Sequence, residues 1–404
     1  GGGGGSHRAG GACVVRMRPS AARALLSPRM RMHTSRYCSA AATVASALTA
    51  VIKPLGAGYA ITCAIALLAQ RKLQYFPSAA RPSHPGAVNT LFADIQEVEF
   101  VSADGTRCLG WHWPAPTAAE PVLPWWLPKD GALPRLAGVV AELRRERLQQ
   151  MDLVLFHGNA GDRSHRLGWM HLVRECLGCS VTVRRMRTHA HAHTLHAHMH
   201  TRTARAAHAL RMHGPQVLDY RGYGGSEGSP TEAGFYQDGA AAVAWVKERQ
   251  RAVAAAAVAA GAQGPPRRRL VLWGESIGTG VALSLAAEAH AVVIEGGFSS
   301  AVDLGATAYP WLPVRWFMLD KFLNTRWAEQ LPRDLPVLMV HGALDDIAPL
   351  RLSRKLFATL PERRRRFVEF AGAGHNDLPY HDSAEYVRAV GTFLGELGEE
   401  VWPG

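Results

Sequence analysis

Between residues 151 and 370, short apolar runs alternate with longer stretches of helical character, and each run ends at a glycine or a polar residue. We predict strands over 152–156, 217–219, 270–273, 292–294, 337–340 and 366–370. Helices are expected between them, for example over 234–251 and 278–289, and a hairpin over 96–101 and 107–113. The Ala-rich run 252–266 is expected to be a surface loop. Apolar strands that alternate with helices predict an α/β fold whose mostly parallel central sheet is covered by helices on both faces.

The chain that precedes this region differs in character. Residues 1–50 contain no acidic side chain, which is typical of a targeting or disordered segment. The apolar run 55–69 spans about 22 Å as a helix, against roughly 30 Å for the hydrocarbon core, and Val51 and Ile52 lengthen it. We therefore predict a single membrane anchor over 51–72. A targeting-peptide core and a buried helix are the alternatives.

These boundaries also predict localisation and domain extent. The protein is expected at a membrane, with the mitochondrion, the chloroplast and the endomembrane system all open. The globular domain is expected to cover 91–397, so a chain that starts near Ala79 should be soluble and active.

Net charge and cysteine content exclude two classes of protein. The formal charge of +12 comes from two segments, 1–93 with 11 basic residues and 181–216 with six, and 28 basic residues then remain against 33 acidic ones. The rest of the chain therefore predicts no nucleic-acid surface. Six cysteines without regular spacing form no disulfide framework.

A G-x-S-x-G sequence over 274–278 follows an apolar run and precedes a predicted helix. In that context the serine lies on a sharp turn between strand and helix, with its hydroxyl exposed at the helix N-terminus. Ser276 is therefore the candidate nucleophile. The alternative is an ordinary glycine-rich turn.

An acid and a histidine follow the last two predicted strands, in that order. Asp345 lies just after the run 337–340, and His375 lies in a glycine-flanked loop after 366–370. A histidine can take the serine proton and return it to the leaving group, and a carboxylate fixes its tautomer. Asp346 could replace Asp345 in this role; the other interpretations are a helix N-cap for the acid and a surface loop for the histidine.

The sequence His-Gly-Asn-Ala-Gly over 157–161 ends an earlier strand. Its backbone can supply one donor to an oxyanion, the N–H of Asn159, and the residue after the nucleophile, Ile277, can supply the second. The alternative is a plain tight turn.

Taken together, these motifs resemble the membrane-anchored α/β-hydrolase-domain proteins of the serine aminopeptidase-like group, from about residue 70 to 397. Further matching segments are 70–77, 219–224, 274–280 and 309–313. The resemblance implies an α/β-hydrolase fold and a serine esterase, lipase or acyl-protein thioesterase, including palmitoyl-protein hydrolases. The expected substrates are lipid-like acyl esters or thioesters, and no cofactor or metal is expected. A soluble carboxylesterase or serine peptidase, and a non-catalytic receptor or scaffold, are the alternatives.

Two segments lie between the predicted core elements. Residues 303–330 are apolar, with Trp311, Trp316, Phe317 and Met318, and predict a small cap over the active site; helices that pack on the sheet are the alternative. Residues 183–216 are a low-complexity insertion with eight of the 19 histidines. A metal-binding tract is one interpretation. Codons compatible with splice boundaries favour a retained intron, whose removal joins 180–182 to 217–219 as one strand.

Overall fold

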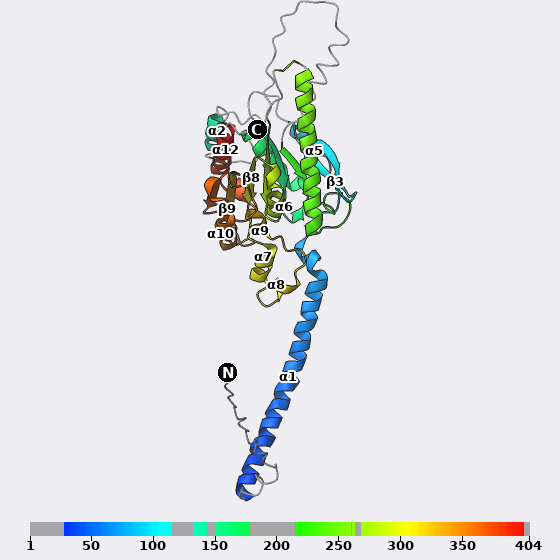
Figure 1. The fold of residues 1–404 in the computed structure, drawn as a ribbon, viewed down its shortest axis with the longest axis vertical. Helices are drawn as coiled ribbons and strands as arrows, with labels where there is room; N and C mark the ends of the chain where they lie inside the picture. Colours follow the sequence, from blue (N-terminus) through cyan, green and yellow to red (C-terminus); the bar gives the residue numbers. More distant parts are fainter. Residues whose placement is uncertain are drawn as a thin grey trace, which may run out of the picture. The chain divides into compact units, whose positions relative to one another are not determined.

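A computed structural model describes residues 28–114, 132–143, 151–177, 215–259, 261–262 and 268–399. The chain forms two compact units, Gly1–Ala66 and Leu67–Gly404, which are considered separately below. Figure 1 shows the ribbon.

Helix α1 (Pro28–Gln74) makes up the described part of the first unit and continues into the second. Its portion Thr43–Gln74, 32 residues long, has the length and the apolar composition needed to cross a membrane once. The segment 51–72, expected to be an anchor, lies within that span.

An eight-stranded sheet forms the centre of the second unit, in the order β10-β9-β8-β7-β4-β6-β3-β2. All neighbours are parallel except β3, which is antiparallel to both β6 and β2. The predicted hairpin and the predicted mostly parallel sheet are therefore confirmed. The strands are β2 (Gln96–Val101), β3 (Arg107–His112), β4 (Met151–Phe156), β6 (Pro215–Leu218), β7 (Arg269–Glu275), β8 (Ala291–Glu295), β9 (Val337–Gly342) and β10 (Arg365–Phe370). A second, small sheet pairs β1 (Phe76–Pro77) with β5 (Ala160–Gly161).

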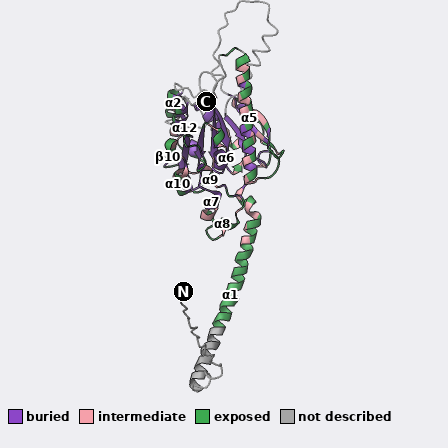
Figure 2. Cartoon of the chain, in the orientation of Figure 1, coloured by how far each residue is buried: buried purple, intermediate pink, exposed green. Residues whose placement is uncertain are grey.

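Helices cover both faces of the large sheet, and alternate residues of β4 show how. Leu153 and Leu155 pack in one apolar cluster with residues of α2, α3 and α12. Val154 and Phe156 pack in the other, with residues of α5, α6 and α10. Figure 2 shows the sheet buried between these layers. The helices are α2 (Ala132–Leu143), α3 (Leu167–His171), α5 (Glu232–Ala259), α6 (Gly278–Ser284), α7 (Ala301–Ala308), α8 (Val314–Phe317), α9 (Asn324–Ala328), α10 (Leu350–Thr359), α11 (Leu378–His381) and α12 (Ser383–Glu399).

Two predicted helix boundaries were wrong. Helix α5 continues through Ala259, so the first part of the run expected to be a loop is helical. Alanine has the highest helix propensity of all residues, which explains the extension. Helix α6 ends at Ser284, five residues before its predicted end at 289, because Leu285 leaves the helical conformation (φ −107°, ψ 3°).

Two residues of the predicted insertion 183–216 lie in a core strand. Pro215 and Gln216 belong to strand β6, where Gln216 pairs with His112 of β3 and Val154 of β4. Residues 178–214, and with them most of the predicted insertion, lie outside the described residues. Excision of 183–216 would place Val181 and Thr182 in the strand positions that Pro215 and Gln216 occupy.

Deletion of residues 183–216 should raise soluble yield and Tm while retaining activity. Excision would replace Pro215 and Gln216, the first two residues of the interior strand β6, with Val181 and Thr182, and β-branched residues are enriched in strands whereas proline is depleted. An increase in Tm of about 2–4 °C corresponds to roughly 1 kcal/mol in a domain of this size. Thermal unfolding of the deletion variant and the full chain measures it, and transcript sequencing gives an independent check on the intron. A variant that is less stable, or folded and inactive, would show that the insertion contributes to the native protein.

The predicted cap segment divides into two parts. Phe322, Asn324 and Ala328 are buried against the body of the domain, in agreement with helices that pack on the sheet. The stretch around α8 is different, because none of the four residues of that helix is buried. The apolar side chains exposed there are Tyr309, Trp311, Trp316, Phe317 and Leu319.

Candidate active site

Ser276 lies in a sharp turn between β7 and α6. Its φ is +53°, a left-handed conformation that side chains other than glycine adopt at a cost of about 1–3 kcal/mol. The flanking glycines are required by space. A Cβ on Gly274 would lie 2.6 Å from Cα of Thr279, and one on Gly278 would lie 2.0 Å from the carbonyl oxygen of Phe156. The turn therefore has the geometry of a nucleophile elbow.

The structure brings Ser276, His375 and Asp345 together in a continuous hydrogen-bonded chain. Nε2 of His375 lies 3.0 Å from Oγ of Ser276, and Nδ1 lies 2.6 Å from Oδ2 of Asp345. The Asp345 carboxylate is buried, and its other oxygen accepts the backbone N–H groups of Ile347 (3.0 Å) and Ala348 (2.7 Å). Asp346, the alternative acid, is exposed. The geometry therefore favours Asp345 over Asp346.

The two predicted oxyanion donors lie beside this chain. Ile277 follows Ser276 directly, and a Cβ on Gly158 would lie 3.5 Å from Cβ of Ser276, so the 157–161 loop packs on the nucleophile. Over the part of the chain that the structure describes, neither the N–H of Asn159 nor that of Ile277 donates to an acceptor. Both N–H groups thus remain available to a bound oxygen atom.

The segment that follows α1 holds the Asn159 loop in place. The side-chain amide of Asn159 donates to the backbone carbonyl of Gln74 (2.9 Å). The backbone carbonyl of Asn159 accepts from the N–H of Phe76 (2.9 Å) and from the Tyr223 hydroxyl (2.9 Å). Tyr75, between them, is buried in the core. A chain that starts near Ala79, which was expected to be soluble and active, would lack both β1 and Tyr75.

A chain that starts at Ala79 should lose about 10²-fold in kcat/KM, since small displacements at a reacting centre have effects of that size. Removal of the buried Tyr75 should also cost about 3–5 kcal/mol of stability. A chain that starts at Leu67, where the second unit begins, keeps both elements and is the matched control. Ester hydrolysis and thermal unfolding of the two chains measure the difference. Equal activity in both would show that the β1–β5 pairing is dispensable.

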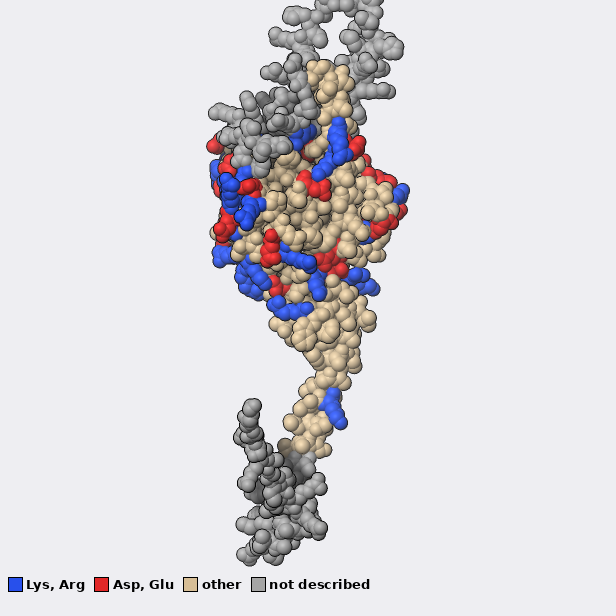
Figure 3. All heavy atoms as spheres, in the orientation of Figure 1, with Lys and Arg blue, Asp and Glu red and all other residues tan. Residues whose placement is uncertain are grey.

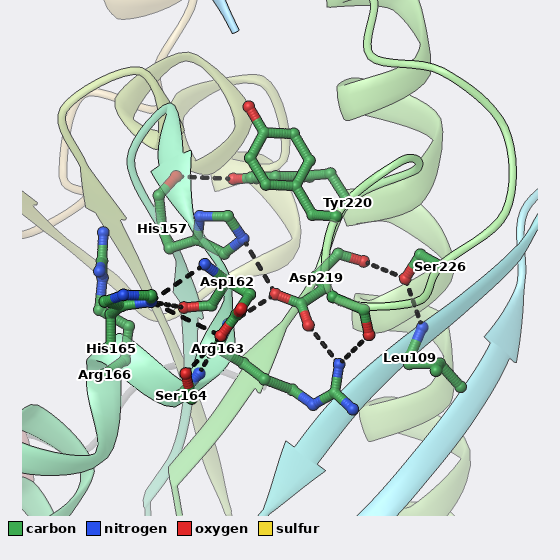
Figure 4. A network of polar contacts seen from close by, with 12 residues as sticks. Leu109, His157, Asp162, Arg163, Ser164, His165, Arg166, Asp219, Tyr220 and Ser226 are labelled. Carbon is green, nitrogen blue, oxygen red and sulfur yellow. Dashed lines mark hydrogen bonds and ion pairs between the residues drawn. The ribbon is translucent and has the colours of Figure 1, made fainter. Parts of the chain in front are cut away.

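A second network, drawn in Figure 4, joins the same loop to the segment after β6. The buried Asp219 accepts the backbone N–H of Arg163 (2.7 Å) and forms an ion pair with its guanidinium. Nε2 of the His157 ring lies 3.4 Å from Asp219. Arg163 also donates to the carbonyl of Gly224 (2.8 Å). No pattern in the sequence predicts these roles, although 219–224 is among the segments on which the family resemblance rests.

Two acidic residues, Glu275 and Glu295, lie at the ends of the neighbouring strands β7 and β8, next to the Ser276 turn. Both oxygens of Glu275 accept hydrogen bonds from Arg166, each of 2.6 Å. Glu295, at the end of β8, is buried, and burial followed by the nearby Glu275 charge raises its pKa to about 7. The Tyr386 hydroxyl and the Trp273 indole donate to it. The next residue, Gly296 (φ +58°), lies against the His375 ring, where a Cβ would be 3.1 Å from Cε1. The absence of a side chain at Gly296 therefore leaves room for the His375 ring.

No group of three or more His, Cys, Asp or Glu side chains that could hold a metal ion occurs among the described residues. The histidine-rich tract, for which metal binding was one interpretation, lies outside them.

Comparison with known proteins identifies relatives of this chain. No family model matches it. The chain is 30% identical over 331 residues to an uncharacterised protein of Mycobacterium tuberculosis, in an alignment that covers 81% of this chain and 88% of that protein. It is 26% identical over 252 residues to protein bem46 of Schizosaccharomyces pombe (60% and 67% covered). It is 29% identical over 216 residues to the lysophosphatidylserine lipase ABHD12 of Macaca fascicularis (46% and 49%).

Among solved structures, an esterase of Pyrococcus furiosus aligns over 80% of this chain and 97% of its own, with 12% identity and a TM-score of 0.47. The similarity to the mycobacterial protein extends over most of both chains, and the parallel sheet with its serine elbow is typical of α/β hydrolases. The chain belongs to the α/β-hydrolase superfamily, in the group of membrane-anchored α/β-hydrolase-domain proteins.

Proposed function

We propose that this hydrolase is a serine hydrolase that cleaves carboxylic esters or thioesters of lipid-like acyl groups through an acyl-enzyme. One observation carries the proposal, namely the chain from Ser276 through His375 to the buried Asp345, with contacts of 3.0 and 2.6 Å. Serine is a weak nucleophile at its ordinary pKa, and an adjacent oriented imidazole is the usual means of activating it.

In the first half of the reaction, Oγ of Ser276 attacks the acyl carbon while Nε2 of His375 takes its proton. The carbonyl π electrons move to oxygen, and the N–H groups of Asn159 and Ile277 stabilise the resulting oxyanion. Collapse of this intermediate breaks the bond to the alkoxide or thiolate, which receives the proton from His375. Asp345 stabilises the imidazolium and holds the ring in the required tautomer.

In the second half, water replaces the leaving group. His375 takes a proton from a water molecule while the water oxygen attacks the carbonyl carbon of the acyl-enzyme. His375 then returns that proton to Oγ of Ser276 when the carboxylic acid leaves. Both half-reactions use the same residues, and every proton that leaves a reactant is returned to a product.

The preference for lipid-like acyl groups rests on separate support. Several large apolar side chains of 309–319 are exposed, and exposed apolar surface of this kind suits an enzyme that meets its substrate at a lipid surface. The helix α1 can cross a membrane, and one relative is named as a lysophosphatidylserine lipase. A soluble carboxylesterase or a peptidase would not require a membrane-spanning helix or an exposed apolar stretch. A non-catalytic scaffold would not require the hydrogen bond between Ser276 and His375.

A fluorophosphonate probe and a chain-length series test the proposal. The probe should label the full chain and should fail to label the Ser276→Ala variant. With p-nitrophenyl esters, kcat/KM should rise from acetate to longer acyl chains, and the matching acyl thioesters separate ester from thioester preference. Labelling with a flat or falling series would indicate a soluble carboxylesterase, whereas absence of labelling would favour the scaffold.

A further inference from the structure

We propose that the exposed stretch 309–319, here called the cap tip, is a second membrane contact that docks on the leaflet at which α1 ends. The stretch includes the described turn around α8 and carries two tryptophans, a phenylalanine, a tyrosine and a leucine on its surface. Trp316 is 82% exposed. Soluble proteins seldom expose several large apolar side chains within so short a segment, and such patches mark interaction sites.

Direct hydrogen bonds tie the cap tip to the last turns of α1. The backbone N–H of Leu319 donates to Oε1 of Gln70 (2.7 Å). Next to it, Asp320 forms an ion pair with Arg71 (2.8 Å) and its carbonyl accepts from the side chain of Gln74 (3.0 Å). Residues 70–74 are the carboxyl end of the candidate membrane span. The apolar run of this helix ends at the polar residues Gln70, Arg71 and Lys72, which mark where the helix reaches the membrane surface, so residues bonded there lie near that surface.

The composition of the tip and its rim fits a lipid surface. Tryptophan and tyrosine prefer the boundary between hydrocarbon and headgroups, where one part of the ring system is buried and the other hydrated. Figure 3 shows few charged side chains over α7 and α8, with Lys and Arg at the border of this region. Arg315 on α8 and Lys355 on α10 are both more than half exposed and both pair with Asp303, and cations are attracted to anionic headgroups.

Docking would also bring the catalytic edge close to the acyl chains. The cap segment begins just after β8, whose following residue Gly296 lies against His375. Leu344 and Ile347, which flank Asp345, are exposed apolar side chains. An ester that leaves the leaflet at this point could therefore reach Ser276 with little exposure of its acyl chain to water. This part of the inference rests on the proposed function, whereas the docking itself does not.

Tryptophan quenching in the full chain tests the docking without any assay of activity. The protein is reconstituted in phosphatidylcholine vesicles with and without bromine on the acyl chains, and the emission of Trp316 is obtained as the difference between the native chain and Trp316→Phe. We expect bromolipid to quench this difference at least about twofold and aqueous iodide to have little effect. Trp245, on α5 and part-buried, is the matched control, and the difference for Trp245→Phe should not respond to bromolipid. Quenching of Trp316 by iodide but not by bromolipid would overturn the proposal, and so would protection from both, which would mean that this chain or a second copy of it covers Trp316 instead of lipid.

A kinetic comparison tests the consequence for substrate delivery. In the full chain, the double variant Trp316→Ser with Phe317→Ser should lose about tenfold in kcat/KM for a long-chain ester carried in vesicles and less than twofold for soluble p-nitrophenyl acetate. Val88→Ser, at an equally exposed apolar position outside the cap, should change neither. Equal loss on both substrates, or none, would overturn the delivery role. If the native chain hydrolyses no ester at all, the proposed function fails, and the quenching result still decides the docking.

Discussion

Replacement of Ser276 with alanine should reduce kcat/KM for a p-nitrophenyl ester by about 10⁶-fold, because the members of a catalytic triad act as a unit. The variant loses the atom that forms the bond to the acyl group, while the elbow keeps its flanking glycines and its hydrogen bonds. Its Tm should therefore stay close to that of the native chain. Steady-state hydrolysis and thermal unfolding, both on the full chain, provide the two measurements. His375→Ala should give a loss of similar size.

Ser284→Ala is the matched control for this result. Ser284 ends the helix that follows the nucleophile, is partly buried and donates only to the carbonyl of Val281 (2.8 Å). Its replacement should change kcat/KM less than twofold. Turnover in Ser276→Ala comparable to that of the native chain would refute the assignment of the nucleophile.

Asp345→Asn should lower kcat/KM by about 10⁴-fold, since an amide in place of the carboxylate presents an N–H to Nδ1 and stabilises the wrong histidine tautomer. The substitution keeps the size of the side chain, and its carbonyl oxygen can still accept the N–H groups of Ile347 and Ala348 that hold the turn. The structural effect should accordingly be small compared with the kinetic one.

Asp346→Asn tests the same prediction from the neighbouring position. Asp346 is exposed, and the identical change of charge there should alter kcat/KM less than twofold. If Asp346→Asn were the more damaging of the two, the carboxylate that orients His375 would have been misassigned.

The residues of the proposed triad could be predicted because each follows a strand of one parallel sheet. Ser276, Asp345 and His375 come after β7, β9 and β10, and the carboxyl ends of such strands meet at one edge. The order of apolar runs along the chain therefore contains the information that places them together. The sequence distinguishes Asp345 from Asp346 as the partner of His375 only by the distance of each from the end of the preceding strand. In the structure Asp345 is buried and Asp346 is exposed, which favours Asp345.

Contacts between segments far apart in the sequence could not be predicted in this way. The bonds of Asn159 to Gln74 and Phe76 join residues more than 80 positions apart, and no local pattern marks either partner. The ion pairs Arg163–Asp219 and Arg166–Glu275 are of the same kind. The incorrect prediction of a loop directly after residue 251 has a different cause. Low complexity suggests a loop, but alanine favours a helix, and α5 continues to Ala259.

The pairing of β1 with β5 has a consequence for how the protein could be released from its membrane. A protease that cuts after Ala66 would free the second unit with β1 and Tyr75 intact. A cut about ten residues later, between Phe76 and Ala79, would remove Tyr75 and Phe76 from the fragment that carries Asn159. The first fragment would diffuse away as an active enzyme, and the second would be shed in an impaired state. The site of cleavage, over a distance of about ten residues, would thus decide whether shedding spreads the activity or ends it.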